Sequence, residues 1–411
     1  MDDSAKLSAN DHRRLGQELD LFVFSDLVGS GLPLFTPRGT VIREELFKLS
    51  TEIQKKRGYQ AVSIPHITKV DLYKKSGHWD KFGEELFLIK SQETKDEMVL
   101  KPMNCPHHIQ IYASKPRSYR DLPVRYMENT IQYRDDKKGE LMGLARVRAI
   151  SIDDSHVFCN MDQIEQEFVL ILDMIREWYE VLQMDFRAIL AFRDDSDKYL
   201  GDKANWDKAE GIIEDVAKKA GLKYEIQRGE AAFYGPKIDI MVTDSMGREW
   251  QCATEQLDMV MPKRFELTYT AKDGSEQPVV MIHKALLGSV ERFLSVYLEH
   301  TGGKFPVWLA PEQIRVATLN DETNTLKMAN NIVEKATEAG LRATLDDSNE
   351  TVSKKVRQAE QMKVPYTLII GPKEAESGHV APRVRADLAK TKLQPIDDFL
   401  SSVSEISKQR K

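Results

Sequence analysis

Residues 122–152, LPVRYMENTIQYRDDKKGELMGLARVRAISI, decide the fold of this chain. Their β-branched and aromatic residues predict two strands, at 122–135 and 144–152. The polar segment Asp136–Glu140 joins them and is typical of the loop of an antiparallel hairpin. Both predicted strands carry arginines, so this hairpin presents positive charge as well as sheet structure.

The residues on both sides of the hairpin predict an α+β fold. Apolar residues recur at helical spacing over 39–57, and this helix leads into a strand that ends before Pro65. A second helix, over 163–184, has an apolar stripe and Asp162 as its N-cap residue. Further strands are predicted at 237–243, 249–258 and 278–282. Because hairpins connect these strands, we expect an antiparallel sheet with helices packed on it.

A linker with glycines and prolines around 302–306 divides the chain into two predicted domains, 1–305 and 306–411. After the linker, strands and helices alternate, beginning with a strand at 314–319 and a helix near 323–338. This alternation is typical of a small, mostly parallel α/β domain. A chain of 411 residues exceeds the size of a single hydrophobic core, which agrees with two domains.

The composition excludes several classes of protein. The net charge of −6 argues against indiscriminate coating of nucleic acid, but it permits a local basic surface for one folded RNA. Three cysteines without short spacings do not form a disulfide framework, so a reducing compartment is expected. Apolar runs of the about eighteen residues that span a membrane do not occur. We therefore expect a cytoplasmic protein with neither a membrane span nor a secretory signal.

Two separate segments place an arginine in a recognisable context. Arg134 lies in YRDD (133–136), and Arg292 lies in GSVERF (288–293). Two guanidinium groups from different segments neutralise a triphosphate and the charge that develops during attack at its α-phosphate. Together with Cys105, His156 and His283, they predict an ATP site beside a metal. The implied chemistry is the formation of an adenylate.

Six short segments carry a resemblance to a known family: KPMNCP (101–106), RVR (146–148), DDSH (153–156), FYGPK (233–237), WQCATEQLD (250–258) and HKALLGS (283–289). In this order they closely resemble threonyl-tRNA synthetases, and several ordered matches are far more specific than one. The resemblance covers nearly the whole chain. It implies a class II antiparallel catalytic domain, a C-terminal anticodon-binding domain, and a homodimer whose interface is formed largely by the helix and strand of 39–65.

The resemblance implies that Cys105, His156 and His283 are zinc ligands. Three nitrogen and sulfur ligands leave a fourth position open, as in zinc sites that engage a substrate. Zinc bound to the amino group and hydroxyl of threonine rejects valine, whereas an apolar pocket alone separates such near-isosteres only ~10- to 200-fold. The neighbouring His107 and His108 are not assigned to the metal.

Serine offers zinc the same two donor groups as threonine, so we expect the site to activate serine as well. Members of this family usually carry an N-terminal editing domain that removes serine from the tRNA. This chain begins almost directly at the catalytic domain, and we expect the editing domain to be absent.

The matched positions also imply the contacts with ATP and threonine. Those near ATP are Arg134, Asp136, Arg146, Gln251, Thr254, Ser289 and Arg292, with Mg²⁺ bridging the phosphates. Those near threonine are Met103, Asp154, Tyr234, Lys237 and Gln256. Three positions depart from the common pattern: Asp136 replaces a glutamate, Ile150 a phenylalanine that stacks on adenine, and Ile152 a glutamine. Lost stacking at Ile150 predicts weaker ATP binding, by about 1 kcal/mol.

The remaining matches concern tRNA. His78, in SGHW (76–79), matches a position near the terminal ribose, where it acts either as a general base or as a hydrogen-bonding group. Asn349, Glu374 and Arg383 match positions that read anticodon bases. Polar side chains of these types suit the exposed base edges of a single-stranded loop.

These residues together predict the activity of the family, the ATP-dependent attachment of threonine to tRNA(Thr), with Arg134, Arg292 and His78 as catalytic residues. A prolyl or glycyl synthetase is a competing interpretation, but those enzymes lack the split Cys/His/His set. A catalytically silent paralogue that binds tRNA as a regulator is another. Such a protein should have lost the two arginines or the metal ligands, and all of them are present.

Overall fold

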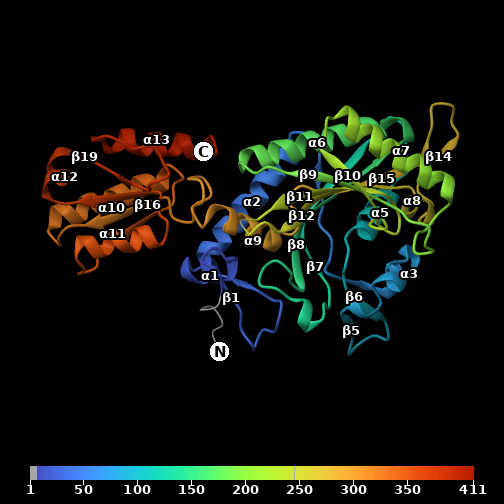
Figure 1. Ribbon diagram of the computed structural model, residues 1–411, viewed down its shortest axis with the longest axis horizontal. Helices are drawn as coiled ribbons and strands as arrows, with labels where there is room; N and C mark the ends of the chain where they lie inside the picture. The colour runs from blue at the N-terminus through green and yellow to red at the C-terminus, as the bar shows by residue number, and fades with distance from the viewer. Residues whose placement is uncertain (1–6, 245) are drawn as a thin grey trace. The chain divides into compact units, whose positions relative to one another are not determined.

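The computed structural model describes residues 7–244 and 246–411, which form two compact units (Figure 1). The large unit consists of Phe24–Pro33 and Leu46–Val296. The small unit consists of the described residues up to Val23, Leu34–Glu45 and Tyr297–Lys411. Each unit has its own sheet and its own hydrophobic core.

An eight-stranded sheet forms the large unit, in the order β10-β9-β11-β12-β15-β8-β7-β3. Neighbouring strands run antiparallel except at the two edges, where β10 pairs parallel with β9 and β3 pairs parallel with β7. The strands span Gln60–Ala61 (β3), Val124–Tyr133 (β7), Ala149–Cys159 (β8), Arg187–Phe192 (β9), Tyr224–Arg228 (β10), Lys237–Thr243 (β11), Glu249–Asp258 (β12) and Val280–Ala285 (β15). The predicted antiparallel sheet is confirmed.

The predicted hairpin is formed by β7 and β8, which pair along their length. Its second strand begins later than predicted, at Ala149, and continues to Cys159. Residues 134–148 form a long loop instead of strand. Arg148 closes this loop by donating two hydrogen bonds to the backbone carbonyl of Asp136, at 3.0 and 2.8 Å. These contacts satisfy a backbone group that no neighbouring strand pairs.

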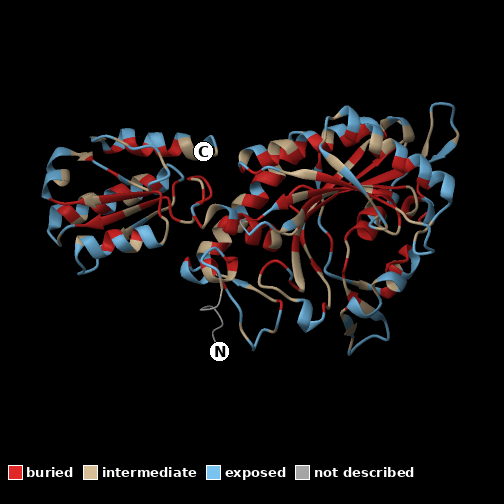
Figure 2. Ribbon diagram, in the orientation of Figure 1, coloured by how far each residue is buried: buried red, intermediate tan, exposed pale blue. Residues whose placement is uncertain are grey.

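Helices α6 (Ile164–Val181) and α7 (Lys203–Lys219) lie along the sheet and turn their buried sides toward it (Figures 1 and 2). The residue that caps the start of this segment is Asn160, whose side chain accepts from the amides of Asp162 and Gln163. The prediction of Asp162 as the cap is wrong, because a short 3₁₀ turn precedes α6 and places Asp162 inside that turn.

The large unit also contains several smaller elements. They are β4 (Ile67–Lys69), α3 (Val70–Ser76), α4 (His78–Phe82), β5 (Leu88–Lys90), β6 (Glu97–Leu100), α5 (Cys105–Ala113), α8 (Met261–Arg264), β13 (Thr268–Thr270) and β14 (Glu276–Pro278). Two further helices, α2 (Pro37–Lys55) and α9 (Val290–Thr301), precede and follow the strands of the sheet in sequence. The predicted helix at 39–57 is confirmed as α2.

The small unit contains a four-stranded sheet in the order β17-β16-β18-β20. Strands β16, β17 and β18 are parallel, and β20 is antiparallel, which confirms a mostly parallel α/β arrangement. The elements span His12–Glu18 (α1), Phe22–Val23 (β1), Leu34–Phe35 (β2), Ile314–Thr318 (β16), Thr323–Glu338 (α10), Ala343–Asp346 (β17), Val352–Gln361 (α11), Tyr366–Ile370 (β18), Pro372–Ser377 (α12), His379–Val380 (β19), Arg383–Val384 (β20), Gln394–Pro395 (β21) and Ile396–Lys408 (α13). None of the helices in the described part of the chain is long and apolar enough to cross a membrane.

Replacement of Trp178 by alanine should lower the stability of the large unit by about 3–5 kcal/mol, because a buried aromatic side chain is lost and a cavity remains. Trp178 of α6 is fully buried, and its ring lies 5.4 Å from that of Phe293, edge to face. Val169 on the same helix is 37% exposed, so Val169→Ala should cost less than about 0.5 kcal/mol. Urea unfolding of both variants measures the difference, and equal losses would contradict the described packing of α6.

Candidate active site and metal centre

A cavity of about 250 Å³ lies on the large sheet, and strands β7, β8, β12 and β15 contribute to its wall. Neighbouring strands present side chains in cross-strand rows, because alternate residues point to opposite faces of a sheet. In one such row, Gln256 lies opposite His283, and His283 lies opposite His156. A single row therefore brings together residues from three segments that are far apart in the sequence.

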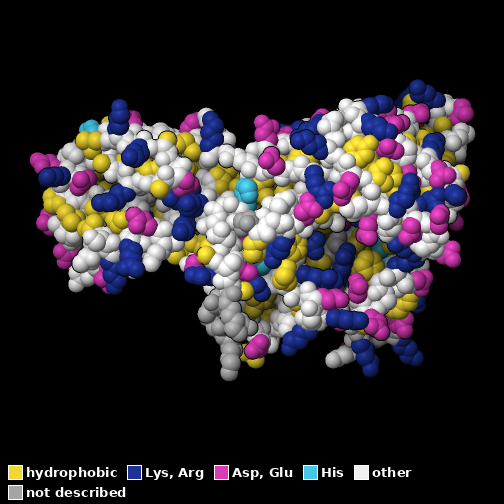
Figure 3. Space-filling model, in the orientation of Figure 1, with side chains coloured by type: hydrophobic (Ala, Val, Ile, Leu, Met, Phe, Trp, Pro, Cys, Tyr) yellow, Lys and Arg dark blue, Asp and Glu magenta, His cyan; other side chains and the backbone are white. Residues whose placement is uncertain are grey.

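Most of the predicted site residues line this cavity. Those predicted to contact ATP are Arg134, Gln251, Thr254, Ser289 and Arg292, and those predicted to contact threonine are Met103, Asp154, Tyr234 and Gln256. Asp136 and Arg146 line an adjoining cavity of about 180 Å³, which shares Arg134, Ser289 and Arg292 with the first. Figure 3 shows Lys and Arg side chains gathered over this part of the large unit, near β7 and β8.

Arg134 and Arg292 are partly buried cations that face the cavity. Arg134 Nη2 contacts Met103 Sδ at 3.2 Å, and Arg292 Nε donates to the carbonyl oxygen of Ala145 at 3.1 Å. Among the described residues, neither arginine forms an ion pair, and Arg134 Nε has no hydrogen-bond partner. Desolvation lowers the pKa of both guanidinium groups, although arginine remains protonated in proteins. Two partly buried charges that lack an ion-pair partner favour an anionic ligand.

Arg146 differs from these two arginines because its charge is already paired. Its Nε donates to Asp136 Oδ2 at 2.9 Å, and its Nη2 donates to Glu140 Oε2 at 3.0 Å. The hydrogen bond with Asp136 is the main reason why the pKa of Arg146 is raised. Arg146 must exchange these carboxylates for a phosphate before it can contact a nucleotide.

Cys105, His156 and His283 come together in the interior of the large unit. All three are buried, and their ligand atoms lie within 4.8 Å of one another. His156 Nδ1 meets His108 Nδ1 at 2.7 Å, and His283 Nε2 meets Asp258 Oδ2 at 2.9 Å. Each imidazole thus has one nitrogen held by a neighbour, which orients the other nitrogen for a metal.

The protonation states of this group suit a metal with nitrogen and sulfur ligands. Burial lowers the pKa of His156 well below its usual value, so its imidazole stays neutral and offers a lone pair. Burial raises the pKa of the Cys105 thiol well above its usual value, so a metal must displace a proton to bind it. The donor set fits zinc, and zinc binding itself stays a prediction.

His78 lies beside this group. Its Nδ1 is 2.8 Å from Ser76 Oγ, and its Nε2 is 3.7 Å from Cys105 Sγ. Burial lowers the pKa of His78 to about 3. An imidazole with this pKa is a weak base near neutral pH, which favours the hydrogen-bonding alternative of the two predicted roles.

Two carboxylates that were not predicted as site residues form hydrogen bonds with residues that were predicted. Asp239 of β11 accepts hydrogen bonds from Gln251 Nε2 at 2.7 Å and Thr254 Oγ1 at 2.9 Å, and it pairs with Lys237. Lys237 therefore points to Asp239 and lines neither cavity. The second carboxylate is Asp258, the partner of a metal-site histidine. Residues 237 and 239 share a face of their strand, and this spacing is the sequence signal that would have found Asp239.

The two aliphatic departures from the family pattern lie on the cavity wall. Ile150 lines both cavities, and Ile152 lines the larger one. The backbone of Ile152 also forms a bridge with Ser289. An aliphatic side chain thus stands where the family pattern has an aromatic face, and the expected loss of ATP affinity stays a prediction.

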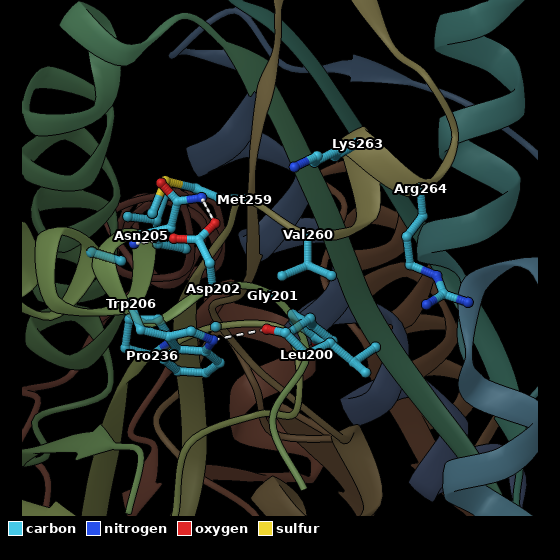
Figure 4. A pocket seen from close by; sticks show the side chains of 14 residues that line it. Leu200, Gly201, Asp202, Asn205, Trp206, Pro236, Met259, Val260, Lys263 and Arg264 are labelled. Atoms are coloured by element: carbon cyan, nitrogen blue, oxygen red, sulfur yellow. Dashed lines mark hydrogen bonds between the residues drawn. The ribbon is translucent and has the colours of Figure 1, made fainter. Parts of the chain in front are cut away.

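A third cavity, of about 460 Å³, is the largest of the three (Figure 4). It shares the lining residue Tyr234 with the first cavity. Its apolar wall includes Leu200 and Val260. Trp206 Nε1 donates to the carbonyl of Leu200 at 2.8 Å, so this polar group is already satisfied within the wall. Because the partly buried cations Arg134 and Arg292 and the metal-type donor His283 lie in the cavity of about 250 Å³, that cavity is the candidate active site.

The predicted anticodon-reading residues lie in the small unit. Asn349 is exposed after the carboxyl end of β17, and Glu374 lies in the first turn of α12, after β18. Arg383 is exposed on β20, opposite Thr367. Glu374 Oε2 accepts the amide of Gly371 at 2.9 Å, which caps the helix. The structure thus brings two of the three residues to the carboxyl end of the parallel strands.

Comparison with known proteins identifies both parts of the chain. Residues 87–301 match the tRNA synthetase class II core domain (G, H, P, S and T), and residues 313–406 match the anticodon binding domain. The threonine–tRNA ligase of Gloeobacter violaceus is 47% identical over 96% of this chain and 64% of its own length. That of Thermus thermophilus is 47% identical over 91% of this chain and 57% of its own length. The chain therefore spans less than two thirds of these relatives.

Solved structures agree with these matches. The RNA binding domain of threonyl-tRNA synthetase from Cryptosporidium parvum is 36% identical, with a TM-score of 0.91 over 96% of this chain and 98% of that chain. Prolyl-tRNA synthetase from the same organism is 18% identical, with a TM-score of 0.73 over 97% of this chain and 79% of that chain, and shares the fold alone.

Three observations define a class II aminoacyl-tRNA synthetase core joined to an anticodon-binding domain. They are the antiparallel sheet, the two arginines of the cavity (Arg134 and Arg292) and the two domain matches. Within that class, the chain belongs to the threonyl-tRNA synthetase family. This membership confirms the resemblance seen in the six short segments. The predicted boundary at residue 305 lies between the two matched regions and stays a prediction.

One Zn²⁺ per chain should bind at Cys105, His156 and His283, with release of about one proton from the buried thiol. Because the pKa of that thiol is raised, zinc affinity should increase as pH rises. Metal analysis and titration calorimetry in buffers of different ionisation enthalpy measure both quantities. Cys105→Ser should lose zinc, whereas Cys159→Ser, which removes another buried thiol, should retain it. Full zinc affinity in Cys105→Ser would exclude this site.

Proposed function

We propose that this chain is a threonine–tRNA ligase. It would activate threonine with ATP to threonyl-adenylate and transfer it to the 3′-terminal ribose of tRNA(Thr). The observation that carries the proposal is one cavity that contains the unpaired arginines Arg134 and Arg292 together with His283. His283 belongs to the group that also contains Cys105 and His156. Family membership supports the same reaction.

The activation step depends on position and charge rather than on a proton shuttle, because a carboxylate attacks the α-phosphorus directly. Arg134 and Arg292 hold the triphosphate and stabilise the charge that develops at its α-phosphate. Mg²⁺ that enters with ATP would neutralise phosphate charge and favour the loss of pyrophosphate. Arg146 exchanges its contact with Asp136 for a contact with the outer phosphates.

Selection of threonine rests on polar groups that are held in place before the substrate arrives. Cys105, His156 and His283 would hold zinc, which would act as a Lewis acid toward the amino and hydroxyl groups of threonine. Tyr234 donates a hydrogen bond to Gln256 Oε1 at 2.6 Å, and Asp154 accepts one from Asn104 Nδ2 at 2.8 Å. Valine lacks the hydroxyl that would bind the zinc, and a site built to bind a hydroxyl rejects an analogue without it far better than an apolar contact does. Serine keeps the hydroxyl and is not rejected in this way.

The second step transfers threonine to tRNA. His78 is the proposed hydrogen-bonding group for the terminal ribose, and its Nδ1 is held by Ser76 Oγ at 2.8 Å. We assign residues 1–305 to the catalytic domain and residues 306–411 to the anticodon-binding domain. In the latter, Asn349, Glu374 and Arg383 contact anticodon bases. The cytoplasm is the proposed compartment, because all three cysteines are free.

We also infer a homodimer. The loop between β1 and β2 exposes several apolar side chains, and Leu27 in this loop is 100% exposed. Phe24 and Val28, on either side of it, are 45% and 44% exposed. An exposed apolar patch of this kind is typical of a protein interface. The loop is followed by β2 and then by α2, the helix that the family resemblance places at the subunit interface.

Threonine-dependent exchange of label between pyrophosphate and ATP should occur with the wild-type protein. Arg292→Ala should reduce this exchange at least about 100-fold, because it removes a buried charge that acts on the transition state. Arg176→Ala removes a surface arginine of α6 and should leave exchange unchanged. Serine should support exchange and valine should not. Absence of exchange with every amino acid would favour the silent paralogue that only binds tRNA.

Leu27→Glu should convert the dimer into a monomer, because it places a charge in the apolar part of the interface. Sedimentation equilibrium measures the change. Leu88→Glu is the matched control, since Leu88 is 68% exposed on β5, and this variant should remain dimeric. A wild-type protein that is monomeric at micromolar concentration would contradict the inference.

A further inference from the structure

A second set of polar groups lies buried in the large unit, and the chemistry above does not use it. Asp153, Ser155 and Lys284 alternate in sequence with residues of the candidate site, and each is at most 1% exposed. Helix α2 adds Ser50 and Gln54, which are equally buried. Buried polar groups are costly unless they are paired, so this set requires an explanation.

Asp153 is the centre of this set. Its carboxylate accepts hydrogen bonds from three consecutive backbone amides, those of Leu286, Leu287 and Gly288, at 3.0–3.1 Å. Ser50 Oγ donates a further hydrogen bond to Oδ2 at 2.5 Å. Burial raises the pKa of Asp153 to about 6, which leaves the group mostly ionised at neutral pH. An ionised carboxylate accepts at both oxygens, as this arrangement requires.

The turn of residues 286–288 leads directly to the predicted ATP contacts. Gly288 has a φ of +68°, and a Cβ at this position would lie 2.0 Å from the carbonyl oxygen of Cys252. The turn therefore lies tight against β12 and tolerates little movement. Ser289 follows it and donates to Glu291 Oε2 at 2.9 Å, and Arg292 lies within the first turn of α9. The conformation of the turn thus determines where Ser289 and Arg292 point.

Hydrogen bonds also connect this turn to α2. Gln54 Nε2 donates to Ser50 Oγ at 2.9 Å, and Gln54 Oε1 accepts from Lys284 Nζ and Ser155 Oγ, each at 2.6 Å. The path from Lys284 through Gln54 and Ser50 to Asp153 is continuous. It joins the interior side of α2 to the segment that carries the catalytic arginine.

We propose that Asp153 is a positioning residue for ATP, which holds the turn 286–288 so that Ser289 and Arg292 face the phosphates, with Ser50 coupling this hold to α2. The proposal rests on the proposed function. Asp153 itself does not line the candidate active site and contacts no reacting group. Its neighbour Asp154 lines the threonine part of the cavity, so effects on the two substrates are separable.

The test is the isosteric variant Asp153→Asn, whose amide nitrogen faces a backbone amide and cannot accept from it. Its KM for ATP in pyrophosphate exchange should rise about tenfold, the scale of one lost hydrogen bond to a charged group, whereas its KM for threonine should stay within about twofold. Hydrogen–deuterium exchange should accelerate in peptides that cover 286–288 and not in those that cover 60–64. A rise in both KM values, or in neither, would overturn the proposal.

Ser50→Ala keeps the three amide contacts and removes only the link to α2, so it should raise the KM for ATP by a smaller factor, about threefold. If Asp153→Asn does not fold, the KM for ATP of Ser50→Ala tests the proposal in its place. Ser155→Ala is the matched control, because it removes a buried hydroxyl that contacts Gln54 but not the Asp153 carboxylate. If the wild-type protein shows no exchange of label between pyrophosphate and ATP, the proposed function fails. In that case, ATP affinity from equilibrium dialysis and hydrogen–deuterium exchange of peptides that cover 286–288 test the role of Asp153 alone. An unchanged ATP affinity and an unchanged hydrogen–deuterium exchange rate in Asp153→Asn would overturn that role.

Discussion

The alternation of side chains along β8 and β15 is the constraint on which the rest of the structure depends. In β8, Asp154 and His156 belong to the candidate site, while Asp153 and Ser155 join the buried network with α2. A shift of one residue in register would exchange these two sets. The long antiparallel pairing of β7 with β8 prevents such a shift, because each strand offers about ten consecutive partners. The pairing of β7 with β8 is therefore required both for the candidate site and for the buried network that involves α2.

The charged residues of the interior are of two kinds. Carboxylates with hydrogen-bond donors around them hold the structure, whereas arginines without an ion-pair partner are available to a ligand. Asp153, Asp154 and Asp239 are each surrounded by hydrogen-bond donors, so their burial is compensated. Arg134 and Arg292 are partly buried, and neither forms an ion pair with a carboxylate of the described residues. Leaving two cations uncompensated is unfavourable in the free protein and becomes favourable only when an anion arrives. This contrast makes these two arginines the most informative residues of the cavity.

The candidate metal centre shows how the same sheet orients ligands. His156 and His283 are cross-strand neighbours, and Cys105 approaches from the start of α5. Each histidine is held through its second nitrogen, by His108 in one case and by Asp258 in the other. Neither of these two supporting residues was assigned a role from the sequence. A supporting residue is recognised by what it touches, and a sequence pattern does not contain that information.

The sequence by itself determined the antiparallel sheet, the second α/β domain and most residues of the cavity, because local periodicity and ordered segments carry this information. It misplaced the start of β8 and the cap of α6, since a loop closed by Arg148 and a 3₁₀ turn depend on contacts outside the local pattern. Only the tertiary structure decided that Gln251 and Thr254 donate to Asp239 and that Asp153 holds the turn before Ser289. These pairings join residues on different strands or on opposite faces, and their geometry exists only once the sheet is assembled.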